Sequence, residues 1–435
     1  MHHPRAHRGG ALPGRDAHRA AGFRAARRRR VRGAARVKPL RTAIVAMSAC
    51  AVVSDAVLIA FYPQFFERRY GVTSALHVGA YVAAISIAVM CTLPLWARLA
   101  RRIDTLRLLL FTQGAAGTLC LASGLADDVL GYWLLTIPMF MCKSSYLLMY
   151  PYLMRMQPPA THAHTIGLLS VVVHVGGILA AGAGGHVMQH AGPAACVGLM
   201  AAGDFAQMAV CGWLLRGGHA AAAEPAAAPE APASRDTGRW RRVLPLCALV
   251  MLFDFSAYLI RPFFSLHWAA VSGSGDQLVA GLVFAIPGGV ALAALVVNQR
   301  LRARGRRLPD AVFPNLLLGA AGLLLQAGPA WWAVLLGRVL FGWALFQLVV
   351  KLEVLLFRLS APERYARDFS VFNFFQNFGV LLASFAAGAL VERHGLAITF
   401  AVAVAGFAAS ALLERLLLPD RAPAALPLAG GRHAA

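Results

Sequence analysis

Four ionisable side chains stand alone inside long apolar stretches of the sequence: Asp55, Lys143, Asp254 and Arg338. A charged group in an apolar surrounding usually lines water or pairs with an opposite charge, because leaving it unpaired is costly. A desolvated carboxylate takes up a proton more readily, whereas a neighbouring ammonium or guanidinium opposes that uptake. We therefore predict that Asp55 and Asp254 exchange protons or contact a cation.

An alternative gives the same charges a purely structural role. Asp55 with Lys143, and Asp254 with Arg338, would then be static ion pairs that hold helices together. Arg338 lies nearer the end of its apolar stretch, which favours a structural or gating role for it. Asp204 is a further carboxylate in an apolar stretch and has no assigned role; it must turn inward or accept a proton.

Uncharged polar side chains in the same stretches are weaker candidates for a binding site. His174, Asn377 and Gln376 either hydrogen-bond a solute or bridge neighbouring helices. Tyr146 and Tyr258 either stack on an amphipathic solute or pack within the protein. The sequence leaves these alternatives open.

The elements that carry these residues are predicted from composition. Of 435 residues, 59% are hydrophobic and 14% are charged, which excludes a soluble enzyme, because soluble domains carry about 25% charged residues. A bilayer-spanning helix needs about 20 mainly apolar residues. Twelve stretches qualify: 40–63, 73–96, 106–126, 131–154, 166–187, 193–215, 243–266, 276–299, 309–327, 330–356, 368–391 and 396–418.

The basic residues predict how these spans are oriented. Of the 41 Lys and Arg residues, 34 fall on the side that holds both termini and 4 on the other side. Basic loops stay in the cytoplasm, so both termini are predicted to be cytoplasmic and the protein to be a multi-pass protein of the inner membrane. The net charge of +22 is explained in this way, without nucleic-acid binding.

The chain divides into five predicted segments. Residues 1–38 hold 12 Lys or Arg and one acidic residue, and we interpret them as a disordered basic tail, unless translation starts further downstream. An Ala- and Pro-rich stretch between the sixth and seventh spans is typical of a linker. The predicted segments are the tail 1–38, a bundle of six helices over 40–216, a linker over 217–242, a second bundle over 243–418, and a C-terminal tail over 419–435.

The two predicted bundles repeat each other. Asp55 precedes Pro63 by eight residues, and Asp254 precedes Pro262 by the same eight, at an offset of 199. The stretch from 159 to 192 aligns with 362 to 395 at an offset of 203. The repeat predicts two similar bundles in the same orientation, related by an axis along the membrane normal. Both prolines are predicted to mark bends.

This pattern resembles the major facilitator superfamily of secondary transporters over about residues 38–420. The stretch WARLARRIDTLRLLL is a degenerate form of the superfamily's loop signature, with Arg101, Arg102 and Asp104 in a cytoplasmic gate loop. The fifth span retains part of an exporter signature through Gly176 and the Gly184–Gly185 pair, without its Gly-Pro step. The resemblance implies an all-α fold of twelve spans in two six-helix bundles.

The resemblance also implies a function. Spans 1, 4, 7 and 10 would line a central cavity, and the bundles would rock about it. Our leading hypothesis is a proton-coupled exporter of a small organic solute, such as a drug-like compound or a siderophore. The alternatives are a proton symporter importing an organic anion or sugar-like substrate, favoured by the two cavity bases, and a membrane scaffold or sensor that transports nothing.

Other classes of site are not supported. The seven cysteines are odd in number and lie singly, which argues against a disulfide framework or zinc site. We expect no metal, no cofactor and no catalytic residue, because the sequence has no phosphate-binding glycine loop or nucleophile motif. The expected partners are a small solute, protons and the lipid bilayer, with the protein as a monomer.

Overall fold

The structure is a computed structural model that describes residues 42–149, 152, 162–217, 237–306, 312–360 and 365–417. All regular secondary structure in these ranges is helical. A first helix covers Thr42–Ala56. The elements that follow in the first half are α2 (Tyr62–Tyr70), α3 (Ala75–Leu99), α4 (Thr105–Gly124), α5 (Val129–Lys143), the 3-10 helix η1 (Ser144–Leu148), α7 (His162–His190) and α8 (Pro193–Arg216).

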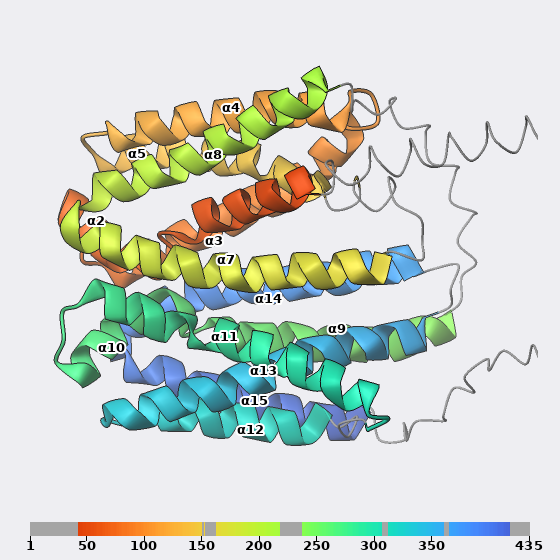
Figure 1. Ribbon diagram of the computed structural model, residues 1–435. Coiled ribbons are helices and arrows are strands. Elements are labelled where there is room, and N and C mark those ends of the chain that lie inside the picture. The colour runs from red at the N-terminus through yellow and green to blue at the C-terminus, as the bar shows by residue number, and fades with distance from the viewer. Residues whose placement is uncertain are drawn as a thin grey trace, which may run out of the picture.

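The second half repeats this order. Its elements are α9 (Thr237–Tyr258), the 3-10 helix η3 (Arg261–Phe263), α10 (Phe264–Ser272), α11 (Gln277–Ala303), α12 (Val312–Gln326), α13 (Trp331–Leu359), α14 (Tyr365–His394) and α15 (Ala397–Leu417). The two halves lie one above the other with their long helices roughly parallel (Figure 1). The chain enters and leaves at one end, here called the tail end; α2 and α10 lie at the opposite, distal end (Figure 1).

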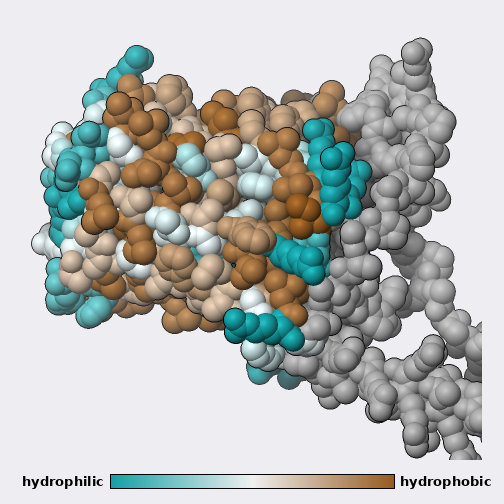
Figure 2. Space-filling view, turned by 90° about the horizontal axis from the view of Figure 1, so that it is seen from above, coloured by the Kyte–Doolittle hydropathy of each residue, from teal (hydrophilic) through white to brown (hydrophobic). Residues whose placement is uncertain are grey.

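The predicted spans agree with these helices. Among the described residues, nine helices are long and apolar enough to cross a membrane, and Thr42–Ala56 and α12 are shorter apolar helices. Eleven of the twelve predicted stretches fall on one of these helices, and the remaining one, 131–154, falls on α5 and η1. This agreement confirms the all-α fold of two six-helix bundles. Figure 2 shows a hydrophobic band across the middle of one face, with hydrophilic residues gathered at both ends. The tail at 1–38 and the C-terminal tail at 419–435 lie outside the described residues.

The two prolines mark breaks, as predicted. The first helix ends at Ala56, and Pro63 lies in the first turn of α2. In the second half α9 ends at Tyr258, and Pro262 lies in the first turn of η3. Proline fits the first turn of a helix because its missing N–H has no partner there.

Glycines at repeat-equivalent positions make equivalent contacts. A Cβ on Gly176 of α7 would meet Val52, and one on Gly379 of α14 would meet the carbonyl oxygen of Met251. Val52 and Met251 are themselves 199 residues apart, the offset of the first and seventh spans. The repeat read from the sequence is therefore also a repeat of packing, since small residues let helices approach closely at the same places.

The two halves pack against each other through α3 with α14 and α7 with α11. Near the distal end the backbones almost touch, because a Cβ on Gly79 would lie 2.8 Å from Gly388 Cα. The equivalent contact joins Gly281 of α11 to the carbonyl oxygen of Ala181 on α7. The distal end is thus closed by close contact between helix backbones.

Two side chains complete this closure by capping helices of the opposite half. The Glu392 carboxylate of α14 accepts the Ala75 N–H at 2.7 Å and the Leu76 N–H at 3.3 Å, at the start of α3. At the equivalent position in α7, the Gln189 amide oxygen accepts the Gln277 N–H of α11 at 3.1 Å. We call these two contacts the trans caps. They satisfy N–H groups that have no partner within their own helix.

The fourth span departs from the prediction of one continuous helix. The α-helix ends at Lys143 and continues as η1. Ser144 Oγ lies 3.0 Å from Thr92 Oγ1, and Ser145 Oγ lies 2.6 Å from Thr112 Oγ1. These hydroxyl contacts to α3 and α4 fix the segment directly after Lys143, the residue around which the candidate site is built.

Candidate functional site

The first half contains a cluster of three charges. The Lys143 ammonium lies 2.8 Å from Asp55 Oδ1 and 2.9 Å from Asp204 Oδ1. It also donates to Ser54 Oγ at 2.7 Å. The first helix, α5 and α8 each contribute to this acidic cluster, defined as Ser54, Asp55, Lys143 and Asp204. One ammonium between two carboxylates leaves a net charge of −1 when both acids are ionised.

The members of the acidic cluster differ in burial. The Lys143 and Asp204 side chains are 2% and 0% exposed, whereas Asp55 is 28% exposed. Asp204 therefore turns inward, as the sequence required, and its role as a partner of Lys143 was not predicted. The sequence signal was present: a carboxylate in an apolar helix needs a cation, and Lys143 lies in a neighbouring apolar stretch.

A glycine makes the Asp204 contact fit. A Cβ on Gly203 would lie 2.6 Å from Ser54 Cβ, so a larger residue would push α8 away from the first helix. Ser54 Oγ lies 2.7 Å from the carbonyl oxygen of Met200 and 3.1 Å from Asp204 Oδ1. A hydroxyl has a single proton to donate, so it serves one of these two acceptors at a time.

In the second half Asp254 lies on α9 and is 5% exposed. The groups close enough to Asp254 to influence its charge are the Gln376 side chain of α14 and the Glu353 carboxylate of α13. No Lys or Arg of the described residues forms a salt bridge with it, and its Oδ2 has no hydrogen-bond partner among them. The alternative interpretation, a static pair of Asp254 with Arg338, is therefore not found among the described residues.

Arg338 binds backbone carbonyls instead. Its guanidinium donates to the carbonyl oxygens of Val283 and Phe284 on α11 and lies 4.1 Å from the centroid of the Phe264 ring. Pro287 of α11 has no N–H, so the carbonyl of Val283, four residues earlier, loses its usual helical donor. Arg338 supplies that donor, which explains why it turns away from Asp254.

A polar stripe follows α14 past Asp254. Asn373, Gln376 and Asn377 share one face because residues three and four apart are neighbours on a helix. Asn377 Nδ2 donates to the carbonyl oxygen of Asn373 at 2.7 Å. Asn377 and Gln376 were predicted as candidates, whereas Asn373 was not.

The remaining candidates lie around these groups. The His174 ring centroid of α7 is 6.5 Å from that of Phe346 on α13, so this contact joins the two halves. Tyr146 of η1 lies close enough to Asp55 and Lys143 to interact electrostatically with both. The Arg261 guanidinium lies over the Tyr258 ring, 5.1 Å from the ring centroid. Whether these side chains contact a solute stays a prediction.

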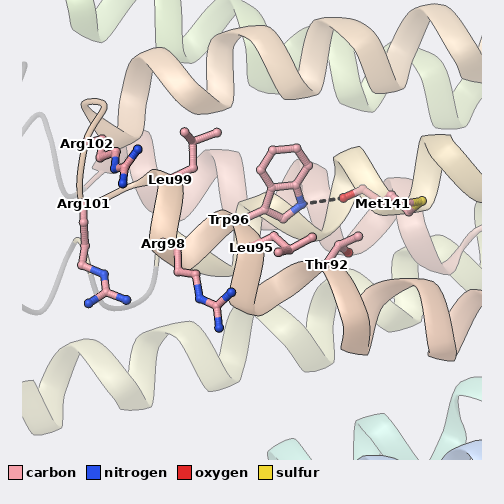
Figure 3. A pocket seen from close by; sticks show the side chains of 8 residues that line it. All are labelled: Thr92, Leu95, Trp96, Arg98, Leu99, Arg101, Arg102 and Met141. Carbon is pink, nitrogen blue, oxygen red and sulfur yellow. Dashed lines mark hydrogen bonds between the residues drawn. The ribbon is translucent and has the colours of Figure 1, made fainter.

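A pocket of about 720 Å³ adjoins the predicted gate loop at the tail end of α3. Figure 3 shows Trp96 at its centre, with the indole N–H donating to the carbonyl oxygen of Met141 at 2.7 Å. Arg101 and Arg102 line its edge and are exposed. Asp104 has a local role, because its carboxylate caps α4 by accepting the Leu106 N–H at 3.0 Å.

Neither a disulfide nor a metal site stands out. All seven cysteines are free, and in the ranges that the structure describes no three His, Cys, Asp or Glu side chains come together.

Comparison with known proteins gives the class. The family model described as Major Facilitator Superfamily matches residues 246–434. No curated protein matches the chain by sequence.

Solved structures match nearly the whole chain. A bacterial homolog to the human lysosomal transporter Spinster, in an inward-facing and occupied conformation, is 14% identical, with a TM-score of 0.70 over 89% of this chain and 98% of that one. A POT peptide transporter in complex with sulfate is 12% identical, with a TM-score of 0.71 over 87% and 93%. The nucleoside transporter NupG is 15% identical, with a TM-score of 0.66 over 87% and 98%.

The fold is therefore the major facilitator fold. The neighbours include a peptide transporter and a nucleoside transporter, so they resolve neither a substrate class nor a direction of transport for this chain.

Proposed function

We propose that this protein is a proton-coupled secondary transporter that exports a small organic solute without net negative charge. The observation that carries the proposal is Asp254, a carboxylate that is 5% exposed and has no salt bridge among the described residues. A buried acid without a cation is favoured in its neutral form. It can take a proton from water on one side and release it when a solute or a conformational change alters its surroundings.

The charge of the solute follows from the partners of the two buried bases. An imported organic anion would need a free cation in the cavity, and Lys143 and Arg338 were the candidates. Lys143 is engaged by two carboxylates, and Arg338 by two carbonyls and the Phe264 ring. These contacts favour a neutral or cationic, drug-like solute over an organic anion.

Alternating access supplies the route. In this proposal the distal end is the extracytoplasmic end, both termini are cytoplasmic, and the monomer lies in the inner membrane. The closed distal contacts of α3 with α14 and of α7 with α11 correspond to a state open toward the cytoplasm. Export is supported by the partial exporter signature at Gly176 and Gly184–Gly185, so solute would enter from the cytoplasm and protons from the distal side.

Transport in liposomes tests the proposal. Purified full-length protein with an internal pH dye is exposed to cationic, neutral and anionic organic solutes, each at matched hydrophobicity. We expect proton movement opposite to the solute for at least one cationic or neutral compound, and loss of at least 90% of it in Asp254→Asn. Asp127→Asn, at an exposed site between α4 and α5, is the matched control.

Other outcomes separate the alternatives. Protons and solute moving in the same direction would establish import by symport, and an anionic solute would overturn the charge argument. Solute flux unchanged in Asp254→Asn would remove this residue from coupling. No flux for any solute, with the protein folded, would favour a scaffold or sensor.

A further inference from the structure

We propose that Asp204 is a positioning residue that allows Asp55 to bind and release a proton. The inference deepens the proposed function and rests on it only for its consequence in transport. It starts from the charge of the acidic cluster, in which a single ammonium contacts two carboxylates at 2.8 and 2.9 Å.

Asp55 is the most exposed charged member of the acidic cluster. Its side chain is 28% exposed, whereas those of Lys143 and Asp204 are 2% and 0% exposed. Among the described residues, Asp55 is bound through Oδ1 to Lys143. In this proposal the proton binds to Asp55, and the carboxylate of Asp204 remains the fixed partner of Lys143.

Counting charges shows what Asp204 contributes. With Asp204 ionised, protonation of Asp55 changes the cluster from −1 to 0, and Lys143 keeps one carboxylate. Without the Asp204 charge, the same step would change the cluster from 0 to +1 and leave a buried ammonium with no counter-ion. An uncompensated buried charge is strongly unfavourable, so a simple Asp55–Lys143 pair would resist protonation.

The packing keeps Asp204 in place for this role. Ser54 and Lys143 surround its Oδ1, while Oδ2 has no hydrogen-bond partner among the described residues. Gly203 lets α8 lie against Ser54. In this proposal Lys143 keeps its contact with Asp204 throughout, whereas its contact with Asp55 is lost when Asp55 is protonated. Proton release from Asp55 restores the second contact.

Infrared difference spectroscopy tests this without any solute. Full-length protein in liposomes is titrated between acid and alkaline pH, and the carbonyl band of a protonated carboxylic acid is followed. Wild type should show a titrating band that disappears in Asp55→Asn. In Asp204→Asn the band should persist but shift to more acidic pH by about one to three units, the usual effect of an unshared cation on a carboxylate. Asp254→Asn should leave the Asp55 band unchanged.

A second variant separates coupling from damage to the fold. Lys143→Met with Asp204→Asn removes both charges of the buried pair, a change that proteins often tolerate. Asp55 should then titrate again at or above the wild-type pH, because no cation opposes its protonation.

Three outcomes would overturn the inference. They are an unshifted Asp55 band in Asp204→Asn, a band that persists in Asp55→Asn but disappears in Asp204→Asn, and no recovery in the double variant. A failed solute screen alongside the expected bands would instead contradict only the proposed function.

Discussion

The two halves have the same arrangement of helices but different kinds of side chain at equivalent positions. Applying the two repeat offsets, Ser54 and Asp204 of the first half correspond to Phe253 and Phe407 of the second. The two phenylalanines are in contact, with ring centroids 5.6 Å apart, and Phe407 also packs on Phe341 at 6.0 Å. A charged contact in one half is thus an aromatic contact in the other.

Among the described residues, each half buries one Lys or Arg side chain, and the two differ in their partners. Lys143 is held by carboxylates, which can gain and lose protons, whereas Arg338 is held by carbonyls and a ring, which cannot. The first half therefore has a base whose partners change charge, and the second has a base with fixed partners and a separate acid, Asp254. The two halves thus share packing positions but differ in their buried charges.

Removing the base of the first half should have the largest effect. Lys143→Met leaves the buried Asp204 and the partly exposed Asp55 without a cation, and breaking a buried ion pair from one side costs about 3–5 kcal/mol. We expect a corresponding loss of thermal stability in detergent at pH 8. The loss should be smaller at pH 5, because protonation removes the uncompensated charges. A loss that is equal at both pH values would contradict the charge explanation.

Removing the base of the second half should cost less. Arg338→Met leaves the carbonyl of Val283 without a donor and removes the contact with Phe264, for a loss of about 1–3 kcal/mol. No acid depends on this base, so the loss should be the same at pH 5 and pH 8. Thermal unfolding of both variants, measured side by side, checks the contrast. A pH-dependent loss would mean that Arg338 has an acidic partner after all.

The trans caps provide the finest comparison, because one is ionised and the other neutral. Glu392→Gln makes them alike and should weaken distal closure by about 0.5–1 kcal/mol, since charge-assisted hydrogen bonds are stronger than neutral ones. Gln189→Glu should strengthen the other cap by a similar amount. The accessibility of a cysteine in place of Ser384, which lies at the Gly79 contact and is 4% exposed, reports the shift in closure. Equal accessibility in both variants would show that the caps do not bias closure.

The sequence predicted the frame of the molecule because membrane spans and repeats leave strong signals. Apolar length located the helices, and the proline and glycine positions located the breaks and close contacts. The contact of Asp204 with Lys143 joins residues 61 positions apart, and the repeat gave no hint, because its counterpart is Phe407. A search for opposite charges does not consider carbonyl acceptors, so it could not find the partner of Arg338. Pro287 was the available sequence signal, because a proline leaves the carbonyl four residues earlier without its helical donor.

The trans caps have a consequence for how the protein is made. The first half emerges from the ribosome and enters the membrane first, when α14 does not yet exist. Until Glu392 arrives, the leading N–H groups of Ala75 and Leu76 have no carboxylate to accept them. Assembly of the distal end is therefore a late step of biogenesis. A residue of α14, the helix before the last one described, thus completes the start of α3, which is synthesised much earlier.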